Sequence, residues 1–314
     1  HRPMTKQCDI KWNSLSPAEW QSRFASIRRS NLLQCYEYAL AVCPINSQSA
    51  RWGLITIDGA EAGLVQIFEV TLLSKLVHVV ILDRGPLWFD GFGSATHWKA
   101  FFARFDMEFK PRFGRSRRIM PETHLQIYDY ARKRAYPPYQ TIWLDLTQDE
   151  IALRANMRKS WRNALAKAER SDLEMRDDLP EKHIIWLLNQ YAADRTARGY
   201  QGPSVKMIMA LAKTFHPRGQ MHVMRALKDE QVIAGILIFT HGRSATYQIG
   251  WTSPDAGRKY NAHHFLLWQA ILKLKEQGIT DFDLGGVNDF SAAGVKLFKE
   301  GLGGESIELC GQYK

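Results

Sequence analysis

The sequence lacks the features of a membrane-spanning or disulfide-rich protein. No window approaches the roughly 18 uncharged apolar residues of a membrane span, and the first residues hold no apolar signal-peptide core. There are few cysteines, none in a CxxC pair or at metal-ligand spacing: Cys8, Cys35, Cys43 and Cys310. We expect reduced, buried thiols in a cytoplasmic protein that does not insert stably in a membrane and whose natural start is Met4.

Motifs for covalent or metal chemistry are also missing. The chain contains neither a GxSxG nucleophile elbow nor a P-loop lysine pattern. His263 and His264 are adjacent on a predicted helix, so their side chains point in different directions, and no acidic or cysteine cluster lies near them in sequence. The sequence therefore predicts no metal site and no covalent enzyme intermediate.

Acidic residues are outnumbered by basic ones. The chain has 42 Lys and Arg against 32 Asp and Glu, a net charge of +10, which favours a polyanionic partner such as nucleic acid, an anionic membrane or a phosphorylated substrate. Basic residues gather in residues 110–118 and 154–170. The second run interleaves an aromatic ring with cations, a pattern that suits RNA, and its candidate RNA-binding residues are Arg158, Lys159, Trp161 and Arg162. A solvated helix face is the alternative.

The length of 314 residues favours two domains, and Pro137-Pro138 marks the boundary between residues 4–140 and 141–314. In the first half, periodicity predicts helices at 16–27 and 95–109 and strands at 51–57, 60–70 and 75–85, with a further strand at 139–146. In the second half, Thr147 and Glu150 form a capping-box pattern. Helices at 159–170, 180–198 and 204–215 precede an antiparallel meander over 220–252, a helix at 262–278, a strand at 279–286, a short helix and a last strand at 306–314.

This order in the second half matches the N-acetyltransferase-like (GNAT) core, and the first half resembles a degenerate version of it. We therefore predict an α/β protein with mixed sheets and two tandem GNAT-like domains. A coenzyme A enzyme on this core normally has a glycine-rich loop after the meander, where backbone N–H groups bind pyrophosphate. Here Asn261 and His263 stand where glycines would let a phosphate approach. The loop is weakened, and we expect no cofactor.

Direct transfer to an amine remains as the favoured chemistry, and it requires a positive group near the developing oxyanion. Lys299, next to Phe298 on the short helix that ends in glycines, suits that role; a surface lysine on a glycine-capped amphipathic turn is the alternative. Asp281 and Asp283 share one face of a strand and are either a base or polar residues at the strand end.

Further candidate substrate-binding residues lie at element ends. Arg195 and Arg198 end a helix, where they either clamp a phosphate or complement the helix dipole. Gly285 and Gly286 would let substrate or backbone approach closely. Tyr200 follows the long helix, and Asp283 lies on the strand at 279–286. The remaining candidates end the meander or follow it: Tyr247, Trp251, Tyr260 and Asn261.

Three segments together resemble the Fem (FemABX) family of aminoacyl-tRNA-dependent transferases, which add amino acids to peptidoglycan precursors. They are "LRANMRKSWRNALAKAERSDLEMR" (153–176), "GWTSPDAGRKYNAHHFLLWQAILKLKEQGITDFDLGGV" (250–287) and "GVKLFKEGLGG" (294–304). The first half joins through "LLQCYEYA" (32–39) and "DRGPLWF" (83–89). The resemblance implies two GNAT-like domains with a cleft between them, aminoacyl-tRNA as donor and an amine as acceptor.

The resemblance also implies roles for residues. Phe298-Lys299 falls on the family's Phe-Lys pair, whose lysine stabilises the carbonyl oxygen during aminolysis, while a ribose hydroxyl of the substrate assists proton transfer. Members that use a UDP-linked precursor tend to have a lysine where Ala41 and Val42 stand here. A long helical hairpin and a C-terminal helix are missing. The acceptor is thus a UDP- or lipid-linked precursor, another peptide or a small amine. The alternatives are an N-acyltransferase that uses acyl-CoA or another acyl carrier, and a non-catalytic RNA-binding protein.

Overall fold

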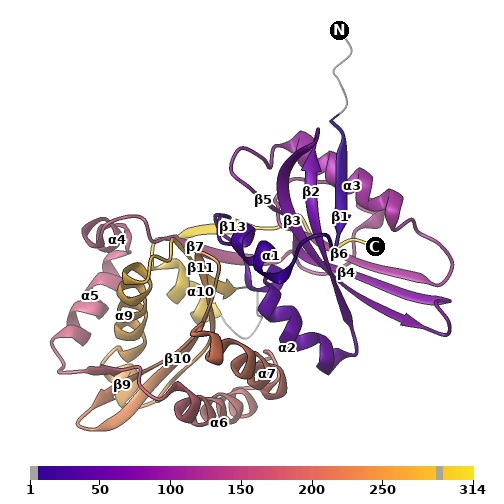
Figure 1. Cartoon of the computed structure of the whole chain (residues 1–314). Coiled ribbons are helices and arrows are strands. Elements are labelled where there is room, and N and C mark those ends of the chain that lie inside the picture. Colours follow the sequence, from indigo (N-terminus) through magenta and orange to yellow (C-terminus); the bar gives the residue numbers. More distant parts are fainter. Residues whose placement is uncertain (1–5, 288–292) are drawn as a thin grey trace. The chain divides into compact units, whose positions relative to one another are not determined.

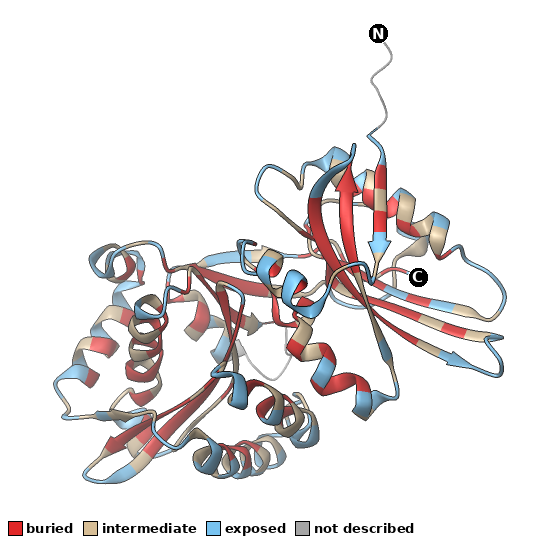
Figure 2. Cartoon of the chain, viewed as in Figure 1, coloured by how far each residue is buried: buried red, intermediate tan, exposed pale blue. Residues whose placement is uncertain are grey.

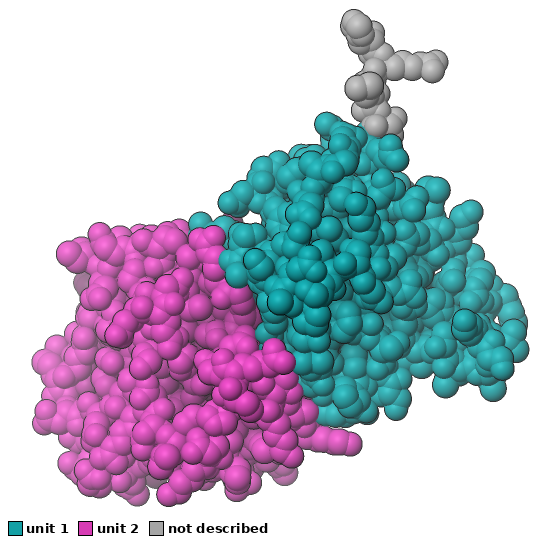
Figure 3. Space-filling view, viewed as in Figure 1, with its two compact units in different colours: residues 1–139, 308–314 teal, residues 140–307 magenta. Residues whose placement is uncertain are grey.

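The computed structural model describes residues 6–287 and 293–314, which form two compact units (Figures 1 and 3). Unit 1 comprises the chain up to Tyr139 together with residues 308–314, and unit 2 spans residues 140–307. The sequence analysis assigned everything after residue 140 to the second domain. In the structure residues 308–314 lie with unit 1, because the backbone of Tyr313 pairs with that of Ile119.

Unit 1 is built on one sheet with the order β1-β2-β3-β4-β6, in which β5 also pairs with β3. Among the strand pairs of unit 1 that the structure describes, β4–β6 alone is parallel. The strands are β1 (Cys8–Trp12), β2 (Ser49–Ile57), β3 (Ala60–Leu72), β4 (Val77–Gly85), β5 (Leu87–Trp88) and β6 (Arg115–Pro121). The helices are α1 (Pro17–Phe24), α2 (Tyr36–Asn46) and α3 (Ala95–Glu108), with 3₁₀ turns at Leu32–Gln34 and Tyr130–Arg132.

The core of unit 1 forms between the sheet and α3. Ser94 caps this helix by accepting a hydrogen bond from the His97 N–H. Apolar residues three and four positions apart then put one aromatic stripe on the sheet side, where it is buried with the inner face of the central strands: Trp98, Phe101, Phe102 and Phe105. Figure 2 shows the resulting buried sheet.

Unit 2 is built on a seven-stranded sheet with the order β13-β7-β12-β11-β10-β9-β8. Its strands are β7 (Gln140–Asp145), β8 (Glu174–Arg176), β9 (Met221–Lys228), β10 (Gln231–His241), β11 (Ser244–Thr252), β12 (Asp281–Gly286) and β13 (Glu305–Glu308). The helices are α4 (Glu150–Asn156), α5 (Lys159–Glu169), α6 (Pro180–Arg198), α7 (Val205–Phe215), α8 (Ala256–Lys259), α9 (Ala262–Glu276) and α10 (Ala293–Glu300), with a 3₁₀ turn at His216–Arg218.

Helices cover both faces of the unit 2 sheet. On β10, Gly235 faces α6, since a Cβ there would lie 2.9 Å from the Trp186 ring. Its neighbours Ala234 and Ile236 point the other way and share a buried cluster with residues of α5 and α9. The two faces of β10 therefore separate α6 from α5 and α9.

These elements confirm the predicted fold class, an α/β protein with two mixed sheets. Two local predictions were wrong. Asp149, not Thr147, caps α4, because its carboxylate accepts from the Ala152 N–H while the Thr147 hydroxyl donates to Asp145. The expected last strand over 306–314 is limited to β13, and the chain beyond it continues into unit 1.

The glycines after α10 form a close turn, and one of them allows a test of the fold. Gly303 has φ +83°, and a Cβ there would lie 2.1 Å from the Asn156 carbonyl oxygen. We expect Gly303→Ala to lower the free energy of unfolding by at least about 2 kcal/mol, from left-handed strain plus a backbone clash.

Gly219→Ala is the matched control, because Gly219 also has positive φ but has no atom within 4 Å of the added Cβ. It should cost only about 1 kcal/mol. Urea unfolding followed by circular dichroism compares the two variants, and equal midpoints would contradict the packing role of Gly303.

Candidate active site

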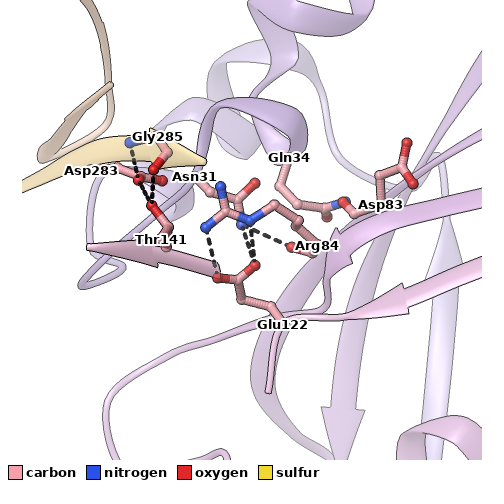
Figure 4. Close-up of polar contacts among 8 residues, drawn as sticks. All are labelled: Asn31, Gln34, Asp83, Arg84, Glu122, Thr141, Asp283 and Gly285. Carbon is pink, nitrogen blue, oxygen red and sulfur yellow. Dashed lines mark hydrogen bonds and ion pairs between the residues drawn. The ribbon is translucent and has the colours of Figure 1, made fainter. Parts of the chain in front are cut away.

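The site lies where two parallel strands of unit 2 part. β11 and β12 pair only from Ser244↔Asp281 to Thr246↔Asp283. Beyond this point β12 bulges against β7, and Asp283 holds the bulge: its carboxylate accepts from the Thr141 hydroxyl and, at 2.9 Å, from the Gly285 N–H (Figure 4). The Thr141 hydroxyl also lies 2.9 Å from the Gly285 carbonyl oxygen. The side chain that the sequence left open as a base is thus a buried acceptor within the strand.

Lys299 points toward this strand end. Its side chain is buried, and its Nζ lies 3.5 Å from the Gly286 carbonyl oxygen and 5.1 Å from the centre of the Tyr247 ring. Gly285 is equally close, because a Cβ on it would lie 3.8 Å from Nζ. Within residues 6–287 and 293–314, no carboxylate forms an ion pair with this ammonium. A buried cation with one long hydrogen bond retains capacity to bind an anionic oxygen.

Burial sets the titration of this lysine. Loss of solvation lowers the pKa of Lys299 to about 8, while the charge of Asp283 acts in the opposite direction. The ammonium is therefore still mostly protonated at pH 7, but it loses its proton at a pH only slightly higher. Groups of this kind are frequent at functional sites.

An aromatic cluster holds the α10 turn in place. The Phe298 ring lies 4.5 Å from that of His263 in a stacked arrangement, 4.7 Å from that of His264, edge to face, and 5.6 Å from that of Trp161. Trp161 Nε1 also donates to the Phe298 carbonyl oxygen at 3.0 Å. The phenylalanine thus anchors the helix, and this anchoring determines where Lys299 points.

Tyr247 and His263 form a neutral polar pair beside the ammonium. The tyrosine hydroxyl lies 3.0 Å from His263 Nε2, and Gly250 leaves room for both, since a Cβ there would lie 1.9 Å from the hydroxyl. Burial, His264 and the charge of Lys299 lower the pKa of His263 to about 3. Burial also raises the pKa of Tyr247. The sequence analysis did not place His263 beside Lys299. It used the adjacency of His263 and His264 only to argue against a metal site.

The structure brings some predicted substrate residues together and separates others. Phe298, Lys299, Tyr247, Asp283, Gly285 and Gly286 surround the strand end described above. Arg195 instead donates to the Gly202 and Pro203 carbonyl oxygens, and Arg198 pairs with Asp194 at 3.3 Å. The Tyr200 hydroxyl donates to the same Asp194, at 3.1 Å. These contacts order the α6–α7 connection.

The other candidates have local partners. Trp251 packs edge to face on Trp186, with ring centres 5.6 Å apart. Tyr260 lies under the ammonium groups of Lys228 and Lys259, and Asn261 adopts φ +53° at the start of α9. None of these contacts involves Lys299.

One of the four residues predicted to bind RNA, Trp161, is buried in the structure. Trp161 is 3% exposed and packs in the aromatic cluster, so its ring cannot stack on a base, and that assignment was wrong. Arg162 donates to the Ala155 and Met157 carbonyl oxygens. Arg158 and Lys159 remain exposed at the start of α5, with Arg158 in a loose pair with Glu300.

The loop between β11 and α9 uses its own backbone donors. The N–H groups of Gly257 and Arg258 bond to Ser253, and that of Lys259 bonds to Asp255. The next two N–H groups, those of Tyr260 and Asn261, bond within the same turn. Five consecutive donors thus have internal partners, whereas a pyrophosphate cradle requires donors that point at the ligand.

Neither metal-binding clusters nor membrane spans are found in the described part of the chain. No three His, Cys, Asp or Glu residues among 6–287 and 293–314 are placed to hold a metal ion. None of the helices in these ranges has the length and apolar character needed to cross a bilayer.

In unit 1 the segments 32–39 and 83–89 meet at a buried polar network. Gln34 Nε2 donates to the Gln66 and Asp83 carbonyl oxygens, and its Oε1 accepts from the Gln66 N–H, so its amide bridges β3 and β4 where their pairing ends. Arg84 forms a two-pronged pair with Glu122 at 2.8 and 2.9 Å (Figure 4). Both segments therefore have structural roles in unit 1.

Comparisons with known proteins agree with this architecture. Residues 153–299 match the model of the acetyltransferase (GNAT) domain. Among solved structures, FemX is similar with a TM-score of 0.78 and 13% identity over 96% of each chain. The chain has the FemX fold. A conserved protein of unknown function from Bacteroides thetaiotaomicron VPI-5482 is similar with a TM-score of 0.59 and 11% identity, over 97% of this chain and 98% of that one. No curated protein matches by sequence.

These findings confirm the tandem GNAT-like fold and the resemblance to the Fem family predicted from the sequence. The residues that match the acetyltransferase (GNAT) domain model, 153–299, lie within unit 2. The donor, the acceptor and the roles of individual residues stay predictions.

The pKa of Lys299 leads to a stability prediction. Burial lowers the pKa of Lys299 to about 8, below its usual 10.5. The charged lysine therefore lowers the free energy of unfolding at neutral pH, and this destabilisation decreases as pH rises from about 8 to 10.5. We expect Lys299→Met to raise the free energy of unfolding at neutral pH, with a gain that shrinks above pH 8.

Lys296→Met is the control, because Lys296 is half-exposed one turn earlier on α10. Its effect should be small and constant over the same pH range. Urea midpoints measured across the pH series decide the matter, and a gain for Lys299→Met that does not change with pH would show that the lysine has an ordinary pKa.

Proposed function

We propose that the protein is an aminoacyltransferase that forms an amide bond between the aminoacyl group of an aminoacyl-tRNA and an amine acceptor. The observation that carries the proposal is the buried ammonium of Lys299, which has no carboxylate partner in the described part of the chain and lies at the parted ends of β11 and β12. A positive group fixed in a place of low polarity is suited to stabilise an oxyanion.

In this mechanism the acceptor nitrogen attacks the ester carbonyl carbon of the aminoacyl-tRNA directly. The carbonyl oxygen becomes an oxyanion, and the protonated Lys299 stabilises it. The C–O ester bond then breaks, the ribose oxygen leaves with a proton taken from the attacking amine, and the amide remains. The neighbouring ribose hydroxyl can relay that proton, which agrees with the low pKa, about 3, of His263, a poor base at neutral pH.

The protein residues supply position and charge in this scheme. Phe298 fixes the α10 turn through its ring contacts with His263 and Trp161. Gly285, with φ +81°, keeps the strand end free of a side chain beside Nζ. Tyr247 offers a ring face to the ammonium.

Two observations support tRNA as the donor. The net charge is +10, and Arg158 and Lys159 lie exposed at the start of α5. The loop at residues 257–261, where a coenzyme A pyrophosphate would bind, bonds its N–H groups internally. The acceptor we favour is the amine of a UDP- or lipid-linked peptidoglycan precursor or of another peptide, as the Fem resemblance implies.

The match of residues 153–299 to the acetyltransferase model favours a second candidate, an N-acyltransferase that uses acyl-CoA. Filter binding of charged and uncharged bulk tRNA across a salt series, with calorimetry of acetyl-CoA on the same preparation, separates the two. Salt-sensitive binding that is tighter for charged tRNA, without coenzyme A heat, supports the aminoacyltransferase. Coenzyme A binding with indifference to tRNA would replace it with the second candidate.

Replacement of the lysine tests the mechanism. Lys299→Met should reduce transfer from radiolabelled aminoacyl-tRNA to an acceptor panel by about 10²- to 10³-fold, because an oxyanion-stabilising charge is removed. Affinity for tRNA should stay unchanged, and Lys296→Met should retain wild-type turnover. Wild-type turnover should itself fall as pH rises above about 8, where Lys299 loses its proton. A variant that transfers at the wild-type rate would remove Lys299 from the chemistry, and a wild type that binds tRNA but never transfers would indicate an RNA-binding module.

The exposed cations of α5 test the tRNA contact. Arg158→Gln/Lys159→Gln should weaken tRNA binding and reduce the salt slope by about one to two units, since each phosphate contact contributes nearly one. Lys206→Gln/Lys213→Gln removes two exposed charges from α7 and serves as the control. Equal slopes for both variants would mean that the start of α5 is ordinary solvated surface.

A further inference from the structure

Unit 1 carries a cationic pocket at one end of its sheet, far in sequence from the residues of the candidate active site. The pocket has a volume of about 350 Å³, and its lining includes four cations and one carboxylate: Arg51, Lys75, Arg112, Arg115 and Glu69. Of these four cations, Arg51 pairs with that carboxylate, at 2.7 Å. Lys75, Arg112 and Arg115 form no ion pair with any described carboxylate, so the pocket has an excess of positive charge.

The pocket is held in shape by a short chain of hydrogen bonds. His78 Nε2 lies 2.7 Å from the Glu69 carboxylate, and His78 Nδ1 accepts from Arg115 Nε at 3.0 Å. An accepting Nδ1 makes this histidine the neutral Nε2–H tautomer, so it adds no charge. Burial and the charges of Arg112 and Arg117 lower the pKa of Arg115, as expected where cations crowd together. The pocket thus combines an excess of positive charge with side chains that hold one another in place.

Exposed apolar side chains lie at the rim of this pocket. The end of the β3–β4 hairpin (residues 71–76, the last two residues of β3 and the turn) abuts the turn before β6 (residues 110–114), and we call these two segments the tip. His78 N–H donates to the Gly114 carbonyl oxygen at 2.9 Å, and a Cβ on Gly114 would lie 2.1 Å from the Leu76 oxygen. The tip exposes large apolar side chains, more than half accessible in each case: Leu72, Leu73, Leu76 and Phe113. Figures 1 and 2 show the two turns side by side and exposed.

The conformation of the hairpin turn is costly for the residues that it contains. Leu73, Ser74 and Lys75 have φ of +51°, +54° and +72°, a region that glycine would occupy without strain. The chain nevertheless places a leucine and a lysine there, and both residues are exposed. Single exposed leucines are common on protein surfaces, but such a cluster around a cationic pocket marks an interaction surface.

We propose that the tip of unit 1 docks on an anionic lipid bilayer, with the leucines and Phe113 in the interfacial region and the cationic pocket on a lipid phosphate. Leucine and phenylalanine beside lysine and arginine are the combination that interfacial membrane binding uses. RNA offers phosphates but no apolar phase for the four exposed apolar side chains. A bilayer of anionic lipids offers phosphates for the cationic pocket and an apolar phase for these side chains. The site is distinct from Lys299, and it does not rest on the proposed transfer reaction.

Flotation of the full chain with lipid vesicles tests the proposal. The protein should float with phosphatidylcholine vesicles that contain phosphatidylglycerol, less so as salt rises, and not with phosphatidylcholine alone. Leu73→Ser/Leu76→Ser/Phe113→Ser should lower the partition coefficient by roughly 100-fold or more, since each apolar side chain that leaves water contributes about tenfold. Lys75→Gln/Arg112→Gln/Arg115→Gln should lower it by roughly fivefold per charge and remove most of the salt dependence.

Matched controls remove similar side chains elsewhere. Ile151→Ser replaces an apolar side chain that is 83% exposed on α4, and Lys182→Gln/Lys206→Gln/Lys213→Gln removes three charges from α6 and α7. Both should float like the wild type. Thermal unfolding checks that every variant is folded.

A second measurement does not depend on those variants. Phe113→Cys can be labelled selectively with an environment-sensitive fluorophore, because three native cysteines are buried and Cys310 is half-buried. Its fluorescence should rise and shift to the blue when anionic vesicles are added.

Several results would overturn the proposal. They are the absence of flotation at low salt, equal losses in tip and control variants, and a label at residue 113 that does not respond to vesicles. Loss of tRNA binding by the basic variant without any vesicle binding would assign the pocket to RNA. Calorimetric binding of glycerol phosphate without vesicle binding would assign it to a free anion.

Discussion

The candidate site depends on the burial of one cation. An ammonium without a carboxylate partner is expensive to place in a protein interior, and here the cost appears as the lowered pKa of Lys299. The groups around the ammonium do not neutralise its charge. They are the ring face of Tyr247, the Gly286 carbonyl oxygen at 3.5 Å and His263, which is neutral at pH 7. Asp283 is close enough to oppose the effect of burial, but its carboxylate is committed to Thr141 and the Gly285 N–H. The charge is therefore not neutralised by a carboxylate in the described part of the chain.

The architecture around this lysine explains how the position is maintained. Parallel pairing between β11 and β12 stops at Asp283, and the bulge against β7 turns the strand end away from the ladder. Phe298 locks the α10 turn among three aromatic side chains, and the glycine turn behind it packs on the end of α4. Several separate elements of unit 2 thus fix one side chain, which is the rigid support that positioning catalysis requires.

The positive charge of the chain is divided between structural and exposed groups. In unit 1, Arg117 pairs with Asp106 at 2.6 Å and donates to the Lys314 carbonyl oxygen, so part of the basic run 110–118 holds the C-terminal segment. Arg112 and Arg115 from the same run line the unit 1 pocket and form no ion pair with any described carboxylate. In unit 2, Arg162 is bonded to backbone while Arg158 and Lys159 are exposed. The net charge alone indicated an anionic partner. The ion pairs and hydrogen bonds of the structure then distinguish cations that are bonded within the protein from exposed cations.

The sequence by itself determined the order of elements, the α/β class and the resemblance to the Fem family, because periodicity and turn residues are local signals. It also indicated Lys299 and Phe298, since a lysine after a phenylalanine before a glycine turn is visible in a single segment. Only the tertiary structure decided that Trp161 is buried, that His263 faces Tyr247 and that residues 308–314 lie with unit 1. Each of these depends on contacts between residues far apart in the chain, such as Trp161 with Phe298. Local patterns cannot encode which distant ring or strand a side chain will meet.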